Sequence, residues 1–211
     1  MKYEVNHPRF ARMYPRLAAW AEANGAQEHR AEALDPARGR VLEIGAGHGL
    51  NFPHYPGAVS GVTAIEPEAT LRDLAKEATR RASAPVTVID GIAEQLPAED
   101  RAFDTVVCSL VLCSVRDLPA ALSEIRRVLK PDGRLCFYEH VRARSAGFAR
   151  YQRAVDLLWP HISGGCRVSR PTDSVIARSG FTVKHLRRFR FPEGRNPSPT
   201  APFVIGMAQP R

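Results

Sequence analysis

The sequence predicts an α/β protein with a doubly wound, mostly parallel sheet, preceded by an N-terminal helical segment. Two observations support this prediction. Strand-like and helix-like stretches alternate over about a hundred residues from residue 40 onward, which is the pattern of parallel strands joined by crossover helices. A glycine-rich turn follows the first of these strands, and ligands of doubly wound sheets bind at such turns.

The first 39 residues are predicted to be helical. Apolar side chains recur at nearly helical spacing, at Phe10, Met13, Leu17, Ala18 and Trp20. A stripe of this kind needs an apolar surface to cover. Two arrangements are open: a helix pair packed permanently on the sheet, and a lid that folds over the ligand crevice and closes when ligands bind.

Five strands are expected next, over residues 40–44, 62–65, 86–89, 103–109 and 135–138. The fourth is almost continuously apolar, as a parallel strand buried on both faces should be. Residues 69–81 and 118–129 place apolar side chains on one helical face. We expect the glycine-rich turn to lead into another helix, and Pro131-Asp132-Gly133 to form a turn that ends the helix before it.

The remaining residues are expected to form helices over 150–159 and 171–179, a glycine-bearing loop at 163–165, and late strands over 181–191 and 203–208. A length of 211 residues fits one domain with additions. We therefore expect a single domain, residues 1–211. Its parts are the N-terminal segment (1–39), a ligand-binding core (40–140), and substrate-side helices with the last two strands (141–211).

Composition and charge exclude several classes of protein. Hydrophobic residues make up 44% of the chain and charged residues 25%, which is typical of a globular protein and excludes collagen-like, coiled-coil and disordered chains. The net charge of +8 is by itself weak evidence for nucleic-acid binding. The basic and aromatic run His185–Phe191 lies where a late strand is expected, and charges protect an edge strand. We therefore expect no nucleic-acid partner.

The four cysteines, Cys108, Cys113, Cys136 and Cys166, contain no C-x-x-C pair, so we expect neither a zinc ribbon nor any other metal site. Buried, reduced thiols are typical of the cytosol. The N-terminus has no apolar signal-peptide core, and the longest apolar run is far shorter than the roughly 20 residues of a membrane span. We expect a cytoplasmic protein with no transmembrane segment. The sequence carries no signal of oligomeric state.

Acidic residues accompany the ends of three successive strands. The first strand runs into Glu43-Ile44-Gly45-Ala46-Gly47-His48-Gly49, whose G-x-G-x-G spacing differs from the dinucleotide fingerprint. A carboxylate two residues before the first glycine suits a cationic ligand better than a pyrophosphate. Glu66 ends the second strand, where it can accept both hydroxyls of a ribose. Asp90 ends the third, where it can accept a bond from an adenine amino group.

In order and spacing, segments of residues 40–140 resemble class I S-adenosylmethionine-dependent methyltransferases: EIGAGHG, IEPE, DGIAEQLP, FDTVVCSLVLCSV and RRVLKPDGRL. The resemblance implies a Rossmann-like methyltransferase fold, a seven-stranded sheet with a reversed final strand, and S-adenosylmethionine as cofactor. It implies that the cofactor-binding residues are Glu43, Gly45, Ala46, Gly47, Gly49 and Asn51 on the methionine side, Glu66 and Pro67 at the ribose, Asp90, Gly91, Ile92 and Ala93 at the adenine, and Cys108 and Ser109 at the amino-acid end.

Three further segments resemble one branch of that superfamily: VVCSLVLCSV, FYEHV and HISGGC-x-x-x-R-x-T. Vertebrate members of this methyltransferase-like branch are membrane-associated thiol S-methyltransferases. We expect no counterpart here to their hydrophobic N-terminal anchor, and therefore not their membrane location. The resemblance implies a small-molecule acceptor, with a thiol as the first hypothesis. The alternatives are O- or C-methylation of a phenol or quinol, and a module that binds S-adenosylmethionine without catalysis.

The acceptor decides whether a base is needed. Ionising a thiol of pKa about 8.5 at pH 7 costs roughly 2 kcal/mol, and ionising a phenol of pKa about 10 costs roughly 4 kcal/mol. O-methylation therefore benefits more from a base. His140, after the fifth strand, and His161 are the candidate catalytic bases, each with a structural role as the alternative. Apolar pocket candidates are Tyr14, Phe52, Tyr55 and Trp159, with core packing as the alternative.

Overall fold

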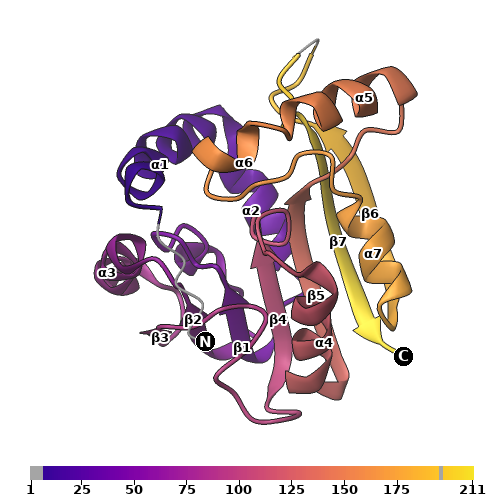
Figure 1. Cartoon of the computed structure of the whole chain (residues 1–211). Coiled ribbons are helices and arrows are strands. Elements are labelled where there is room, and N and C mark those ends of the chain that lie inside the picture. The colour runs from indigo at the N-terminus through magenta and orange to yellow at the C-terminus, as the bar shows by residue number, and fades with distance from the viewer. Residues whose placement is uncertain (1–6, 195–196) are drawn as a thin grey trace.

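The computed structural model describes residues 7–194 and 197–211, and it is built around one seven-stranded sheet (Figure 1). The strand order is β3-β2-β1-β4-β5-β7-β6. The strands are β1 (Gly39–Ile44), β2 (Val59–Ile65), β3 (Val86–Ile89), β4 (Phe103–Ser109), β5 (Leu129–His140), β6 (Phe181–Arg190) and β7 (Pro202–Pro210). The first five are parallel, and β7 runs antiparallel to both β5 and β6. The predicted mostly parallel sheet with a reversed last strand is confirmed.

The strand order reverses at β1, which places a ligand crevice at a defined edge of the sheet. From β1 the chain adds β2 and β3 on one side, and it then crosses to β4 on the other. Ile44 at the end of β1 pairs with Ile65 of β2 and with Cys108 of β4, so these strands end level with one another. Ligands of open α/β sheets bind outside such carboxyl ends, at the point of reversal.

The two predicted crossover helices are present and carry side-chain caps. The carboxylate of Glu68 accepts the Leu71 N–H at 2.8 Å and caps α3 (Ala69–Ala78). Asp117 likewise caps α4 (Leu118–Val128) by accepting the Ala120 N–H at 3.0 Å. The apolar face of α4 is buried against the sheet. Caps of this kind satisfy N–H groups that have no partner within the helix.

Three local predictions were wrong. The glycine-rich turn leads into a single 3-10 turn (Phe52–His54) rather than a helix, because Pro53 and Pro56 prevent helical continuation. Residues 131–133 belong to β5, which follows α4 directly. The helix expected over 150–159 is divided into α5 (Ala146–Val155) and α6 (Trp159–Ile162). Pro160 lies in the first turn of α6, a position that proline favours.

The N-terminal segment forms two helices that differ in their packing; its residues 1–6 lie outside the described residues. α2 (Gln27–Leu34) contacts β5 and β7, and its Ala33 and Leu34 are buried. α1 (Pro8–Ala21) lies across the carboxyl edge of the sheet, next to α6 (Figure 1). Between them Gly25 has φ +101°, in the region that favours glycine. Only α1 is therefore placed as a lid would be.

The last helix, α7 (Thr172–Arg178), packs against β6. The late strands β6 and β7 agree with the sequence expectation to within a few residues. Among residues 7–194 and 197–211, none of the helices combines the length and the apolar character that a membrane crossing requires.

Candidate active site

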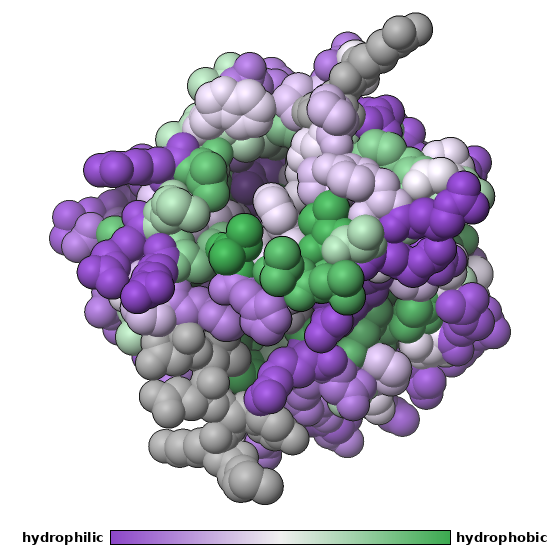
Figure 2. All heavy atoms as spheres, turned by 45° about the horizontal axis from the view of Figure 1, so that its top comes forward, coloured by the Kyte–Doolittle hydropathy of each residue, from purple (hydrophilic) through white to green (hydrophobic). Residues whose placement is uncertain are grey.

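A cavity of about 1330 Å³ opens at the carboxyl edge of the sheet. Its floor is formed by the ends of the first four strands, and α1 and α6 contribute its outer wall. Hydrophobic side chains gather on the face that carries these two helices (Figure 2). Pockets for one small ligand usually measure about 300–1,000 Å³, so this cavity has room for a cofactor and an acceptor together.

The glycine-rich turn is held close to the loop after β4. Gly45 has φ +69°, and a Cβ atom there would lie 2.4 Å from Val111 Cγ2. Its N–H and that of Ala46 both donate to the Ile65 carbonyl oxygen, at 2.8 and 3.0 Å. Only glycine allows both this backbone conformation and this close approach. The turn therefore presents backbone rather than side chains to the cavity.

Glu66 lines the cavity floor and is 5% exposed. One carboxylate oxygen accepts the Gly47 N–H at 2.8 Å, and the other accepts the Glu68 N–H at 2.9 Å. Burial raises the pKa of Glu66 to about 7, although these two bonds act against the shift. Each oxygen keeps a further lone pair, so the carboxylate can accept two more hydrogen bonds from a ligand.

The cofactor-binding residues expected from the sequence divide into two groups. Those that line the cavity are Gly45, Gly47, Glu66, Pro67, Gly91, Ile92, Ala93 and Ser109. Those that the structure places outside its lining are Glu43, Ala46, Gly49, Asn51, Asp90 and Cys108. The Asp90 side chain is 72% exposed and pairs with Arg72 at 3.3 Å. The Ser109 hydroxyl is buried without a hydrogen-bond partner among the described residues, so it is available to a ligand.

Glu43 supports the turn from below instead of facing the cavity. Its carboxylate accepts bonds from Asn51 Nδ2 at 2.9 Å and from the Tyr55 hydroxyl at 2.7 Å. Asn51 in turn accepts a bond from Arg30 at 3.1 Å, and Arg30 donates to Glu22 at 2.9 Å. This buried chain of hydrogen bonds ties the N-terminal helices to the glycine-rich turn.

Arg30 lines the cavity and was not predicted from the sequence. It lies among the polar residues of QEHRAEAL, where an arginine is expected to be on the surface. Only the fold places Arg30 over Asn51 and leaves the arginine just 5% exposed.

Replacing Glu43 by Gln should stabilise the protein at high pH. Burial raises the pKa of Glu43 from 4.5 to about 7, so between these values the folded state binds more protons than the unfolded state. The unfolding free energy of the wild type therefore falls as pH rises through that window. Glutamine carries no such penalty, and the variant should gain on the order of 3 kcal/mol relative to wild type between pH 4.5 and pH 8. Urea unfolding measures this, and parallel pH profiles would contradict it.

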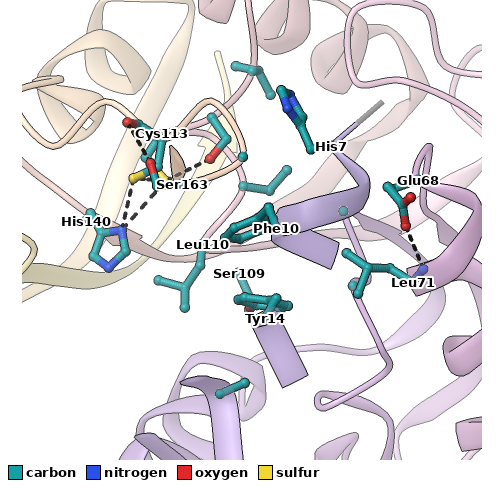
Figure 3. A pocket seen from close by; sticks show the side chains of 18 of the residues that line it. His7, Phe10, Tyr14, Glu68, Leu71, Ser109, Leu110, Cys113, His140 and Ser163 are labelled. Atoms are coloured by element: carbon teal, nitrogen blue, oxygen red, sulfur yellow. Dashed lines mark hydrogen bonds between the residues drawn. The ribbon is translucent and has the colours of Figure 1, made fainter. Parts of the chain in front are cut away.

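The outer part of the cavity is largely aromatic and aliphatic. Tyr14 and Trp159 line it, as proposed from the sequence, whereas Phe52 and Tyr55 belong to the core beneath the turn. Phe10 and Tyr14 of α1 line the cavity and lie close together in it (Figure 3). Such a wall suits an apolar acceptor.

The two candidate bases lie in different environments. His140 lines the cavity near Cys113 (Figure 3). Its Nδ1 is 3.7 Å from the Cys113 sulfur and 3.6 Å from the Cys166 sulfur. His161 is exposed on α6 and is not among the residues that line the cavity. The contact between His140 and the two cysteines was not predicted, because the three residues come from separate segments.

The carboxylate of Glu139 holds the loop that carries Cys113. It is completely buried and accepts the N–H groups of Val111, Leu112 and Cys113 at 2.8–3.2 Å. Burial raises the pKa of Glu139 well above its usual value. The next residue on the strand is His140. Glu139 and His140 together therefore position both partners of the contact between Cys113 and His140.

Comparison with known proteins identifies the chemistry. A model of the methyltransferase domain family matches residues 42–137. The thiol S-methyltransferase TMT1B of Rattus norvegicus is 33% identical over 178 residues, which cover 80% of this chain and 69% of the relative. The human TMT1B is 32% identical over 183 residues, covering 84% of this chain and 74% of the relative. The chain belongs to the S-adenosylmethionine-dependent methyltransferases.

The same fold occurs in a methyltransferase of Thermotoga maritima, with a TM-score of 0.70 at 22% identity, covering 96% of this chain and 98% of that one. The resemblance stated from the sequence is thus confirmed at the level of family and fold. As an enzyme of this family, the methyltransferase transfers a methyl group from S-adenosylmethionine. The matched segment begins and ends in the sheet that forms the cavity floor.

Proposed function

We propose that this methyltransferase transfers the methyl group of S-adenosylmethionine to the sulfur of a small, apolar thiol. The observation that carries the proposal is the identity of about a third to thiol S-methyltransferases, which spans 80% of the chain and so extends beyond the cofactor-binding core. The aromatic outer wall of the cavity supports an apolar acceptor, since it offers few polar groups to orient a hydrophilic one.

The cofactor is proposed to lie on the cavity floor. Glu66 would accept the ribose hydroxyls, Ser109 would meet the amino-acid end, and Gly91, Ile92 and Ala93 would surround the adenine. The unfilled lone pairs of Glu66 and the unpartnered Ser109 hydroxyl fit a polar ligand at this place. Asp90 and Cys108 are proposed to act by shaping the adjacent backbone, because their side chains lie outside the lining.

Thiol transfer also agrees with the base chemistry of the site. A thiol needs roughly 2 kcal/mol less assistance than a phenol to ionise at pH 7. The protein's main tasks are then to align sulfur, methyl carbon and leaving sulfur, and to exclude water. We further propose that the enzyme is a single domain and is cytoplasmic. The four free cysteines support the cytoplasmic location.

A panel of acceptors tests the proposal. The purified enzyme with S-adenosylmethionine should release S-adenosylhomocysteine with apolar alkyl and aryl thiols, and the product should be the methyl thioether by mass spectrometry. Each thiol is paired with the phenol or alcohol of the same carbon skeleton as a matched control. Turnover of the phenols or of quinols with no turnover of the thiols would overturn the choice of acceptor.

A further inference from the structure

Two cysteines and a histidine meet at one side of the cavity. Cys113 lies in the loop after β4, His140 ends β5, and Cys166 lies in the loop between α6 and α7. The two sulfurs are 3.6 Å apart, and His140 Nδ1 is 3.7 and 3.6 Å from them. The three ligand-type atoms thus form a nearly equilateral triangle, and all three residues line the cavity. Figure 3 shows Cys113 and His140 side by side at one side of it.

These distances agree with the face of a tetrahedral zinc site. With Zn–S bonds of about 2.3 Å and a Zn–N bond of about 2.0–2.1 Å, tetrahedral angles put two sulfurs about 3.8 Å apart and a sulfur and nitrogen about 3.6 Å apart. An ion could therefore bind with little movement of the side chains. A disulfide between the cysteines would need their sulfurs to approach to about 2.05 Å.

The backbone around the triangle is organised to keep it assembled. Glu139 holds the Cys113 loop through three N–H bonds. Gly165 has φ +86°, and a Cβ atom there would lie 3.1 Å from the Ser114 carbonyl oxygen, so glycine lets the Cys166 loop approach the Cys113 loop closely. Arg170 then joins the two by donating to the carbonyl oxygens of Leu112 and Val115, each at 2.7 Å.

Charge and donor type both indicate the ion. Two thiolates and one neutral imidazole balance the charge of a divalent cation, which lowers the cost of burying it. Sulfur and imidazole donors select zinc over magnesium or calcium, which prefer oxygen. Three protein ligands leave a fourth position open, as in catalytic zinc sites. Because the three residues line the cavity, that position is accessible to a ligand inside it.

We propose that Cys113, His140 and Cys166 bind one Zn²⁺ ion, whose open position takes the sulfur of the acceptor thiol. The second half of this proposal rests on the proposed function. Each thiol that ligates the ion releases one proton to solvent. The acceptor sulfur then forms a bond to the methyl carbon, and the carbon–sulfonium bond breaks with its electron pair passing to the cofactor sulfur. The products are a methyl thioether and S-adenosylhomocysteine.

Metal binding is measured directly on the full chain, reduced and freed of metal by a chelator. Titration with Zn²⁺ against a chromophoric chelator should show one tight site per chain, and X-ray absorption of the zinc-loaded wild type should show two sulfur neighbours and at least one nitrogen. Co²⁺ should give the visible absorption of a tetrahedral site with thiolate ligands. Cys113→Ser, Cys166→Ser and His140→Gln should each weaken binding roughly a hundredfold or more, whereas Cys136→Ala, which removes another buried thiol, should not.

Two results would overturn the metal site. One is a reduced wild type, with Cys113 and Cys166 both recovered as free thiols, that shows no stoichiometric binding of Zn²⁺. The other is Cys166→Ser binding as tightly as wild type while its melting temperature shows it to be folded.

The acceptor half has its own readout. Adding an apolar thiol to the Co²⁺ protein should shift its visible spectrum, and the matching alcohol should not. A spectral shift with no methylated product would contradict thiol methylation, whereas the metal site would still be supported. An unchanged spectrum despite thiol methylation would overturn the metal-bound acceptor.

Discussion

Replacing Glu66 by Ala is expected to weaken S-adenosylmethionine binding at least tenfold while the protein remains folded. Hydrogen bonds to a charged acceptor are worth about 1.5–3 kcal/mol each, and the carboxylate has two lone pairs left after it accepts the Gly47 and Glu68 N–H groups. Losing even one bond to the ribose accounts for a factor of ten. Calorimetry measures the affinity, and a wild-type dissociation constant in the variant would contradict the assignment.

Two controls separate this effect from a disturbed turn. Asp73→Ala removes an exposed carboxylate from α3 and should bind the cofactor like wild type. The second control uses pH. Because burial raises the pKa of Glu66 to about 7, the ionised acceptor is formed as pH rises from 6 to 8. Wild-type affinity should increase over that range, whereas the Glu66→Ala variant should lose this component.

Sequence patterns predicted the sheet well because strands and helices depend on apolar patterns among residues that are close in sequence. The buried strand β4 is almost continuously apolar, and α4 repeats its apolar residues with helical period. Two of the three errors arose at prolines that interrupt the expected helix, at Pro53 after the glycine-rich turn and at Pro160 between α5 and α6.

The site was less predictable because its parts come from distant segments. The ends of strands could be inferred, and Gly45, Gly47 and Glu66, which were expected there, line the cavity. Sequence spacing carries no information about the 3.6 Å contact between Cys113 and Cys166, which are 53 residues apart. The expectation that the cysteines form no metal site rested on the lack of a C-x-x-C pair, and such a test detects only ligands that are close in sequence.

Removing residues 1–39 is expected to abolish folding, whereas removing only residues 1–21 is expected to leave a folded protein that binds the cofactor. The difference lies in α2. Leu34 is completely buried, and deleting a single large core side chain costs about 2–5 kcal/mol. The longer truncation also removes Arg30, so Asn51 loses a partner in the chain of hydrogen bonds beneath the glycine-rich turn. These losses together approach the total stability of a typical domain, about 5–15 kcal/mol.

The chain that begins at Glu22 keeps α2 and the bond between Glu22 and Arg30, but it loses the wall formed by α1. Tyr14 and Phe10 no longer cover the cavity, so water enters and the acceptor is no longer held in line with the methyl group. We therefore expect near-normal cofactor affinity by calorimetry, with the methyl-transfer rate reduced at least tenfold. Full activity of this chain would show that α1 does not act as a lid, and a folded, cofactor-binding chain beginning at Arg40 would show that α2 is not part of the core.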